Sequence, residues 1–444
     1  MSPYAHRLPN GFGLSVEPLP GHGSGLVSVA LTVAVGGDDD PAGRHGMAHL
    51  VEHLMFPRGG DGAGAAATDG GADSHVARVE GAGGFCNAET HRDHTVFHTT
   101  VPAGMLPDVL KWEARRLLDF APTDAVLRTE TAAIAEEIRG AAAGGRVWET
   151  ALAALHPGSR DSFGTPAELS NASAAEATAF FRRHYRPDAM VLSVVGDVDA
   201  DRVAASVETL FAPLRAGADP VYGPDPVPRT APDASGTTPG TSDTADTAPD
   251  SAAAGTFSVR TAPLPSAVGG VALGYPLPDP VSRRDAYLAQ VVLAEHLGRS
   301  LLPRLTRRDP RLVSARITCG YHGQWLSSAA PDLALVLLAR APGASAADAV
   351  DGWLGVLRGA AGEPAGADDH RRAVNGLLLA CHRTADSLTA RAVTHGRTAL
   401  LFPGSGGLAA LPADLARVTP RDVSAAARTL LAGPCSATEL GENR

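Results

Sequence analysis

The most informative pattern in this chain lies in residues 45–56, which read His45-Gly-Met-Ala-His-Leu-Val-Glu-His-Leu-Met-Phe56. Within this stretch, His49, Glu52 and His53 form a His-x-x-Glu-His pattern on a predicted helix. Residues four apart lie on the same face of a helix, so His49 and His53 can hold one metal ion between them. Glu52 lies at the edge of that face, where its carboxylate can act as a general base. Two histidines and a glutamate on a solvated helix face would give the same pattern, so the hypothesis requires a third ligand.

A second predicted helix offers two candidates for the third ligand. Residues 127–138 read Leu-Arg-Thr-Glu-Thr-Ala-Ala-Ile-Ala-Glu-Glu-Ile. Glu130 and Glu137 are two helical turns apart and share a face, whereas Glu136 points about 100° away from Glu137. The residues alone leave open which of Glu130 and Glu137 binds the metal and which supports it. An acidic pair that only faces solvent is the alternative interpretation.

The composition limits the classes of function. The chain has 444 residues, and its 44% of hydrophobic residues suffice for buried cores, which excludes global disorder. The formal net charge of −10 argues against nucleic acid or an anionic membrane surface as the main partner. The 4 cysteines form no Cys-x-x-Cys pair, so neither a disulfide framework nor a thiolate zinc site is expected. Residues 1–20 show no signal peptide, and the apolar stretch 26–35 is too short to span a bilayer, so we expect a cytoplasmic protein.

Three segments are predicted along the chain. Residues 216–250 are rich in proline and aspartate and almost free of large apolar residues, which is typical of a flexible linker. We therefore predict a metal-binding domain over 1–215, a linker over 216–256 and a second domain over 257–444. Strand-like and helix-like stretches are interspersed in both halves without a strict βαβ rhythm. The predicted fold class is an α/β sandwich of two similar domains, each a mainly antiparallel sheet flanked by helices, and the second lacks the metal motif.

The expected elements follow from hydrophobic periodicity and from bounding Gly or Pro residues. The expected strands are 26–35, 189–195, 266–275 and 333–338. The expected helices are 45–56, 105–118, 127–139, 284–297 and 370–383.

Further short motifs are spread along the chain. They are Leu8-Pro-Asn-Gly11, Gly83-Gly-Phe-Cys-Asn-Ala-Glu-Thr90 with Asp93 and Thr95, Phe163-Gly-Thr-Pro166, His184-Tyr-Arg-Pro-Asp188 and Val195-Gly-Asp-Val198. Together with residues 46–56, these motifs resemble those of the pitrilysin/insulinase-type zinc peptidases. The resemblance is strongest to the two-domain branch that includes the beta subunit of the mitochondrial processing peptidase and bacterial homologues, and it covers nearly the whole chain.

The resemblance implies a site for one zinc ion per chain, with His49, His53 and Glu137 as ligands and Glu52 as general base. Glu130, Glu137 and Ile138 fit the family's Glu-x₆-Glu-Ile pattern, in which the second glutamate binds zinc and the first supports it. Glu137 lies further from His53 than in typical relatives. The Gly/Ala/Asp-rich stretch 59–73 accounts for this excess as a loop insertion.

The resemblance also bears on substrate and partner. It assigns Asn87, Ala88 and Glu89 to a strand that binds the substrate as an added β-strand, a mode that favours extended peptides. Self-sufficient relatives carry an Arg–Tyr pair in the second domain. Arg307 aligns with the arginine when one extra residue is allowed before it, but Ser314 occupies the tyrosine position. We therefore expect a homologous partner subunit that carries the Arg–Tyr pair, with a homodimer as the alternative.

The expected function is zinc-dependent endopeptidase activity on extended peptides, with this chain as the catalytic subunit of a heterodimer. Processing of precursor or leader peptides is a role that follows only by analogy. The rival function is that of a non-catalytic structural or substrate-binding subunit of a peptidase-like complex. Such subunits typically have broken metal motifs, whereas the complete set is present here: His49, Glu52, His53 and Glu137.

Overall fold

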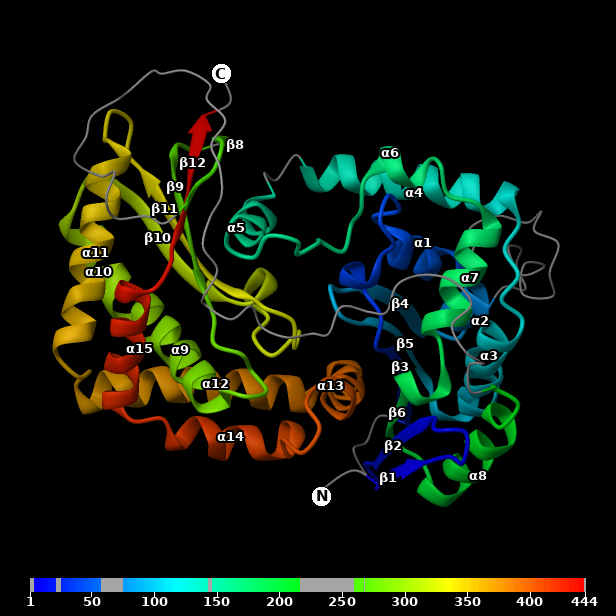
Figure 1. The fold of residues 1–444 in the computed structure, drawn as a ribbon. Coiled ribbons are helices and arrows are strands. Elements are labelled where there is room, and N and C mark those ends of the chain that lie inside the picture. The colour runs from blue at the N-terminus through cyan, green and yellow to red at the C-terminus, as the bar shows by residue number, and fades with distance from the viewer. Residues whose placement is uncertain are drawn as a thin grey trace.

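Two six-stranded sheets, each with helices packed against it, form the two halves of the molecule (Figure 1). The computed structural model describes residues 4–20, 25–56, 75–142, 146–215, 259–266 and 268–442. Its two mainly antiparallel sheets confirm the predicted α/β fold class. The predicted linker, 216–256, and the predicted loop insertion, 59–73, lie outside the described residues, so the domain boundaries stay predictions. Within the described residues, no helix is both long and apolar enough to cross a membrane.

At one end of the first sheet lies an edge strand. In the described part of the chain, this strand has a neighbouring strand on one side only. The order of the sheet is β1-β2-β6-β3-β5-β4, which places β4 at an edge. All neighbouring pairs are antiparallel except β2 with β6. The central strands β3 and β6 are almost entirely buried, as their continuous apolar sequences require. The strands are β1 (Tyr4–Arg7), β2 (Gly13–Pro18), β3 (Leu26–Val33), β4 (Phe85–Thr90), β5 (Thr95–Pro102) and β6 (Met190–Gly196).

The helices of the first half bury the apolar face of this sheet. Phe12, Phe97 and Phe211 are fully buried in the same cluster as Leu50 and Val51 of α1, so the metal-motif helix is part of the core. The helices are α1 (Met47–Leu54), α2 (His75–Gly81), α3 (Leu106–Leu118), α4 (Asp124–Ala142), α5 (Val147–Leu155), α6 (Pro166–Leu169), α7 (Ala174–His184) and α8 (Ala200–Phe211).

The second half has its own sheet, with strand order β10-β11-β9-β12-β7 and with β8 beside β12. Its core contains Tyr287 and Trp353, both fully buried. The strands are β7 (Val259–Arg260), β8 (Leu264–Ser266), β9 (Gly270–Pro276), β10 (Leu312–Cys319), β11 (Leu333–Arg340) and β12 (Ser436–Glu442). The helices are α9 (Arg284–His296), α10 (Leu302–Arg308), α11 (Ala346–Gly362), α12 (Ala367–Asp386), α13 (Leu388–Leu401), α14 (Gly407–Arg417) and α15 (Pro420–Ala432).

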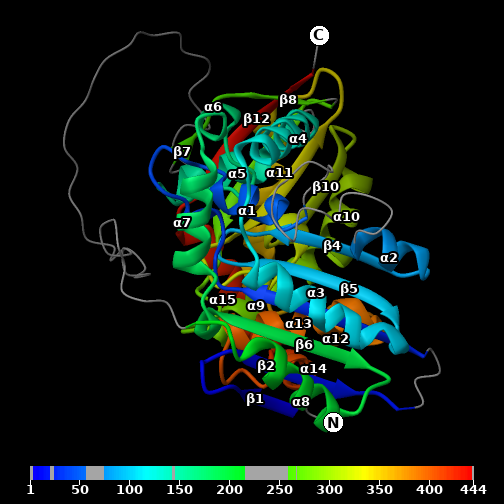
Figure 2. The ribbon, with the colours of Figure 1, turned by 90° about the vertical axis from the view of Figure 1, so that its right-hand side faces the viewer.

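One helix from each half packs against the sheet of the other half. α13 belongs to the second half by sequence, but it packs against β3 and β6 of the first sheet (Figures 1 and 2). A Cβ atom on Gly396 of α13 would lie 2.4 Å from Oγ1 of Thr32, so only glycine allows this close approach. In the other direction, α5 packs against β9 and β12. There Trp148 joins an apolar cluster with Ala272 and Leu335. Each half therefore buries part of the other half's sheet.

Buried polar contacts also join the halves. The carboxylate of Glu17 accepts hydrogen bonds from Arg391 Nε and Nη2 at 2.5 and 2.6 Å, and it lies 2.6 Å from His395 Nε2. Burial raises the pKa of Glu17, but the contacts with His395 and Arg391 outweigh burial and lower it to about 2. Oδ2 of Asp93 accepts the backbone N–H groups of residues 329 and 330 at 2.7 and 3.0 Å. The halves are thus held together by charge as well as by apolar packing.

One predicted strand, 266–275, is wrong at its start. Residues 264–266 form β8, which pairs with β12, and β9 begins separately at Gly270. A Cβ on Gly270 would lie 2.3 Å from the carbonyl oxygen of Leu338, so the backbone changes partner where glycine permits a close approach to β11. The other predicted strands and helices correspond to observed elements whose ends differ by a few residues.

Candidate metal centre

The helix α1 is fixed at its start by a buried carboxylate. Gly46 precedes the helix in the left-handed region, with φ 104°. Asp40 accepts the backbone N–H of Gly46 through Oδ2 at 2.6 Å and that of Ala48 through Oδ1 at 2.8 Å. These contacts satisfy N–H groups that the first turn of a helix leaves free. The orientation of α1 is therefore set before His49 and His53, which follow one turn apart.

Three side chains, two from α1 and one from α4, converge on one point. His49, His53 and Glu137 each offer a ligand atom, and these atoms lie within 4.8 Å of one another. Oε2 of Glu137 is 3.6 Å from Nε2 of His49 and 3.5 Å from Nε2 of His53. Ligands about 2.0–2.1 Å from a tetrahedral zinc ion are about 3.4 Å apart, so this set fits such an ion. Among the described residues, this is the one group of His, Cys, Asp or Glu side chains found close enough to hold a metal ion.

The protein holds the other ring nitrogen of each histidine. Nδ1 of His53 lies 3.1 Å from Oε2 of Glu130, which is fully buried. Nδ1 of His49 lies 3.1 Å from the carbonyl oxygen of Phe163. With the proton on Nδ1 in both rings, each Nε2 presents its lone pair to the shared point. The Phe163 contact was missed from the sequence because a backbone carbonyl leaves no residue-type signal.

Carboxylates dominate the surroundings of the histidines. Burial lowers the pKa of His49, but the hydrogen bond with Glu137 and the charge of Glu52 outweigh burial and raise it. Glu136, about 100° from Glu137 on the helix, is exposed and pairs with Arg139. The site thus concentrates negative charge where a cation would be bound.

Glu52 lies on α1 with the two candidate histidine ligands and contacts β4. Its carboxylate is half-buried, and Thr90 Oγ1 donates a hydrogen bond of 2.6 Å to its Oε2. Burial raises the pKa of the nearby Tyr185 phenol, and the charge of Glu52 raises it further. The sequence places Glu52 next to the histidines, but the contact with Thr90 joins two distant segments and was not predicted.

The edge strand β4 carries the residues expected to bind substrate. Asn87 and Glu89 are exposed, whereas Ala88 and Thr90 face the half-buried side. A hydrogen bond of 3.2 Å with His91 lowers the pKa of Glu89. In the described part of the chain, the outer backbone edge of β4 has no neighbouring strand, so it can pair with an added one.

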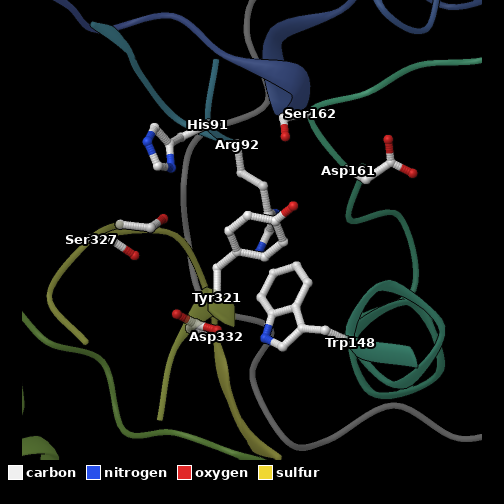
Figure 3. A pocket seen from close by; sticks show the side chains of 9 residues that line it. His91, Arg92, Trp148, Asp161, Ser162, Tyr321, Ser327 and Asp332 are labelled. Carbon is white, nitrogen blue, oxygen red and sulfur yellow. The ribbon is translucent and has the colours of Figure 1, made fainter. Parts of the chain in front are cut away.

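A pocket lies between the two halves beside the loop that contacts His49 (Figure 3). Trp148 and Tyr321 meet edge to face, with ring centroids 4.8 Å apart. Trp148 Nε1 and Ser327 Oγ are buried without a hydrogen-bond partner among the described residues. Burial raises the pKa of Asp332 to about 7. The lining residues, drawn from both halves, are His91, Arg92, Trp148, Asp161, Ser162, Tyr321, Ser327, Ser328 and Asp332.

The residue of the second half that was predicted to bind substrate lies on α10. Arg307 is exposed near the end of α10, and α10 packs against β10, which carries Ser314. Figure 1 shows the helix α10 well away from the helix α1. The role of Arg307 in substrate binding stays a prediction. The phenol that the second half places in the pocket belongs to Tyr321.

Comparison with known proteins finds two matches to one peptidase family along the chain. The family described as Insulinase (Peptidase family M16) matches residues 22–143, and the one described as Peptidase M16 inactive domain matches residues 171–309. A Mycobacterium tuberculosis protein described as an uncharacterized zinc protease is 30% identical over 216 residues. That match covers 48% of this chain and 47% of the relative, so the chain spans about half the relative's length.

Two further similarities agree with this result. Insulin-degrading enzyme-like 2 of Arabidopsis thaliana is 26% identical over 202 residues, which cover 42% of this chain and 20% of that protein. The crystal structure of a protease from Helicobacter pylori has a TM-score of 0.79 at 17% identity and covers 99% of both chains, which shows a shared fold. The chain belongs to the pitrilysin/insulinase family of peptidases, peptidase family M16.

Proposed function

We propose that this chain is a zinc-dependent endopeptidase that hydrolyses peptides bound in an extended conformation. The observation that carries the proposal is the shared point between His49, His53 and Glu137, with Glu52 on the same helix as the histidines. Two imidazoles and one carboxylate are a ligand set of catalytic zinc sites, which keep a fourth position open. One zinc ion per chain would be held there.

Each side chain of the site has a distinct task in this proposal. A bound zinc ion would supply Lewis-acid activation of water and of the scissile carbonyl. Glu52 takes the proton of the attacking water and delivers it to the leaving amine. Glu130 and the carbonyl of Phe163 hold the Nδ1 protons of His53 and His49, which keeps both Nε2 atoms directed at the ligand position.

The edge of β4 supports the proposed substrate class. Asn87, Ala88 and Glu89 would pair through their backbone N–H and C=O groups with an added strand. Such pairing needs a peptide whose own backbone is free, so unfolded segments fit and folded domains do not. Precursor or leader peptides are substrates of this kind.

We further propose that a homologous partner subunit completes the active unit. Arg307 lies on α10, which Figure 1 shows well away from α1, and Ser314 has no phenol. Both observations support a second chain as the source of the Arg–Tyr pair that self-sufficient relatives carry. A partner of the same fold would supply that pair, and a homodimer is the alternative arrangement. The cytoplasmic location stays a prediction from the sequence.

A purely non-catalytic role finds no support in the site. It would leave the grouped side chains of His49, His53 and Glu137, and the adjacent Glu52, without a task. We therefore retain the peptidase proposal alone.

The test compares wild type with Glu52→Gln in hydrolysis of unstructured fluorogenic peptides, with zinc and with or without the homologous partner. We expect wild-type hydrolysis that a chelator abolishes and zinc restores. Glu52→Gln should keep its zinc and lose about 10²–10⁴-fold in kcat. Equal rates for the two proteins would contradict the peptidase proposal. A wild-type rate that the partner does not change would contradict only the partner proposal.

A further inference from the structure

We infer that Thr90 is a positioning residue for Glu52 and links this general base to the strand that binds the substrate. The inference rests on the proposed peptidase function. Oγ1 of Thr90 donates a hydrogen bond of 2.6 Å to Oε2 of Glu52, which joins the last residue of β4 to the helix α1. A hydrogen bond to a charged acceptor is stronger than one between neutral groups.

The local structure holds the Thr90 hydroxyl in place. Side chains alternate along β4, and Thr90 lies on the same half-buried side as Cys86 and Ala88. Opposite Thr90 in the strand register is Thr95, whose Oγ1 donates a hydrogen bond of 2.8 Å to the carbonyl oxygen of Val35. The branched side chain of threonine also has few χ1 rotamers, so little reorientation is available to its hydroxyl.

This contact selects one orientation of the Glu52 carboxylate. The terminal torsion of a glutamate side chain is broad, so an unrestrained carboxylate would sample many orientations. With Oε2 bound to Thr90, Oε1 is the oxygen left to accept a proton from water. Small losses of alignment between a base and its proton donor reduce rates strongly.

The position of Thr90 also couples base and substrate. Asn87, Ala88 and Glu89 precede it directly on β4. A peptide that pairs with the edge of β4 would restrain the backbone that carries the Thr90 hydroxyl. Occupation of the edge would therefore further restrain the orientation of Glu52 that the Thr90 hydroxyl already selects.

The test uses three substitutions in the zinc-loaded chain, assayed with its partner wherever the partner raises the rate. Thr90→Val keeps the shape and loses the hydroxyl, Thr90→Ala also removes the bulk, and Thr90→Ser keeps the hydroxyl. Thr209→Val, at an exposed position on α8, is the matched control. Zinc content, kcat and KM are measured for each protein.

We expect Thr90→Val and Thr90→Ala to lower kcat about 10–100-fold with zinc content and KM close to wild type. Thr90→Ser should recover most of the rate, and Thr209→Val should match wild type. A wild-type kcat in Thr90→Val would overturn the inference, as would loss of zinc in that variant or failure of Thr90→Ser to recover. A wild type no faster than Glu52→Gln would instead contradict the peptidase proposal itself.

Discussion

Nδ1 of His53 lies 3.1 Å from Oε2 of Glu130, and this carboxylate is fully buried behind the candidate metal ligands. Glu130→Gln should lower zinc affinity about 10–100-fold while the ion can still be bound, because the substitution removes the charge that holds the ring. Competition with a chromophoric chelator measures this affinity. Glu136→Gln is the control, since Glu136 is exposed on the same helix. Equal affinities of the two variants would show that the buried contact does not support the ligand.

Because α13 packs closely on the first sheet, replacing a glycine by alanine should affect stability differently at two helical positions. Gly396→Ala would bring a Cβ atom to 2.4 Å from Thr32 Oγ1, whereas Gly355 on α11 has open space around it. We expect Gly396→Ala to lower the free energy of unfolding by about 1–3 kcal/mol. Gly355→Ala should raise it by about 0.5–1 kcal/mol. Urea denaturation measures both, and equal effects would argue against the close packing of α13.

The contact between the buried carboxylate of Glu17 and the half-buried Arg391 predicts a loss of stability when it is broken. Arg391→Met should lower the free energy of unfolding by about 2–3 kcal/mol. This cost is at or below the low end of the range for breaking a buried ion pair, because His395 still contacts Glu17 in the variant. Lys111→Met, which breaks an exposed pair with Asp108, should cost less than about 1 kcal/mol. Similar costs for both variants, measured by denaturation, would show that the halves are not joined by this contact.

His45 predicts a pH dependence of stability. Burial lowers the pKa of this imidazole, but its contacts with Asp161 and Asp40 outweigh burial and raise it from 6.5 to about 9. The folded state therefore binds the proton more tightly than the unfolded state. The resulting stabilisation is complete below pH 6.5 and is lost as the pH rises through about 9.

The measurement is thermal unfolding of wild type and His45→Gln between about pH 6 and pH 10. At the acidic end of this range, the wild type should unfold at a higher temperature than His45→Gln. This difference between the two proteins should shrink toward the alkaline end. A difference that stays constant with pH would show that protonation of His45 is not linked to folding.

The sequence predicts the parts of the site that depend on local spacing. His49 and His53 are four residues apart, and a helix brings such residues to one face whatever surrounds it. The pair of Glu130 and Glu137 is equally local, but residue spacing left the choice between them open. The resemblance to known peptidases favoured Glu137, and the structure places Glu137 beside both Nε2 atoms.

Contacts between distant segments could not be predicted in the same way. The contact of Thr90 with Glu52 joins residues whose proximity depends on how β4 and α1 pack. The position of α13 on the first sheet could not be predicted either, because the apolar face of a helix does not indicate which sheet the helix will cover. The start of β9 at Gly270 was missed since the hydrophobic pattern continues across a change of strand partner.

The zinc content of the purified chain is the measurement on which the proposed metal centre depends. Mass spectrometry of wild type should find about one zinc ion per chain, because two imidazoles and a carboxylate are already gathered around one point. Glu137→Gln should lose most of this zinc during dialysis. A wild type that binds no zinc, or a Glu137→Gln protein that retains it fully, would contradict the assignment of His49, His53 and Glu137 as the ligands.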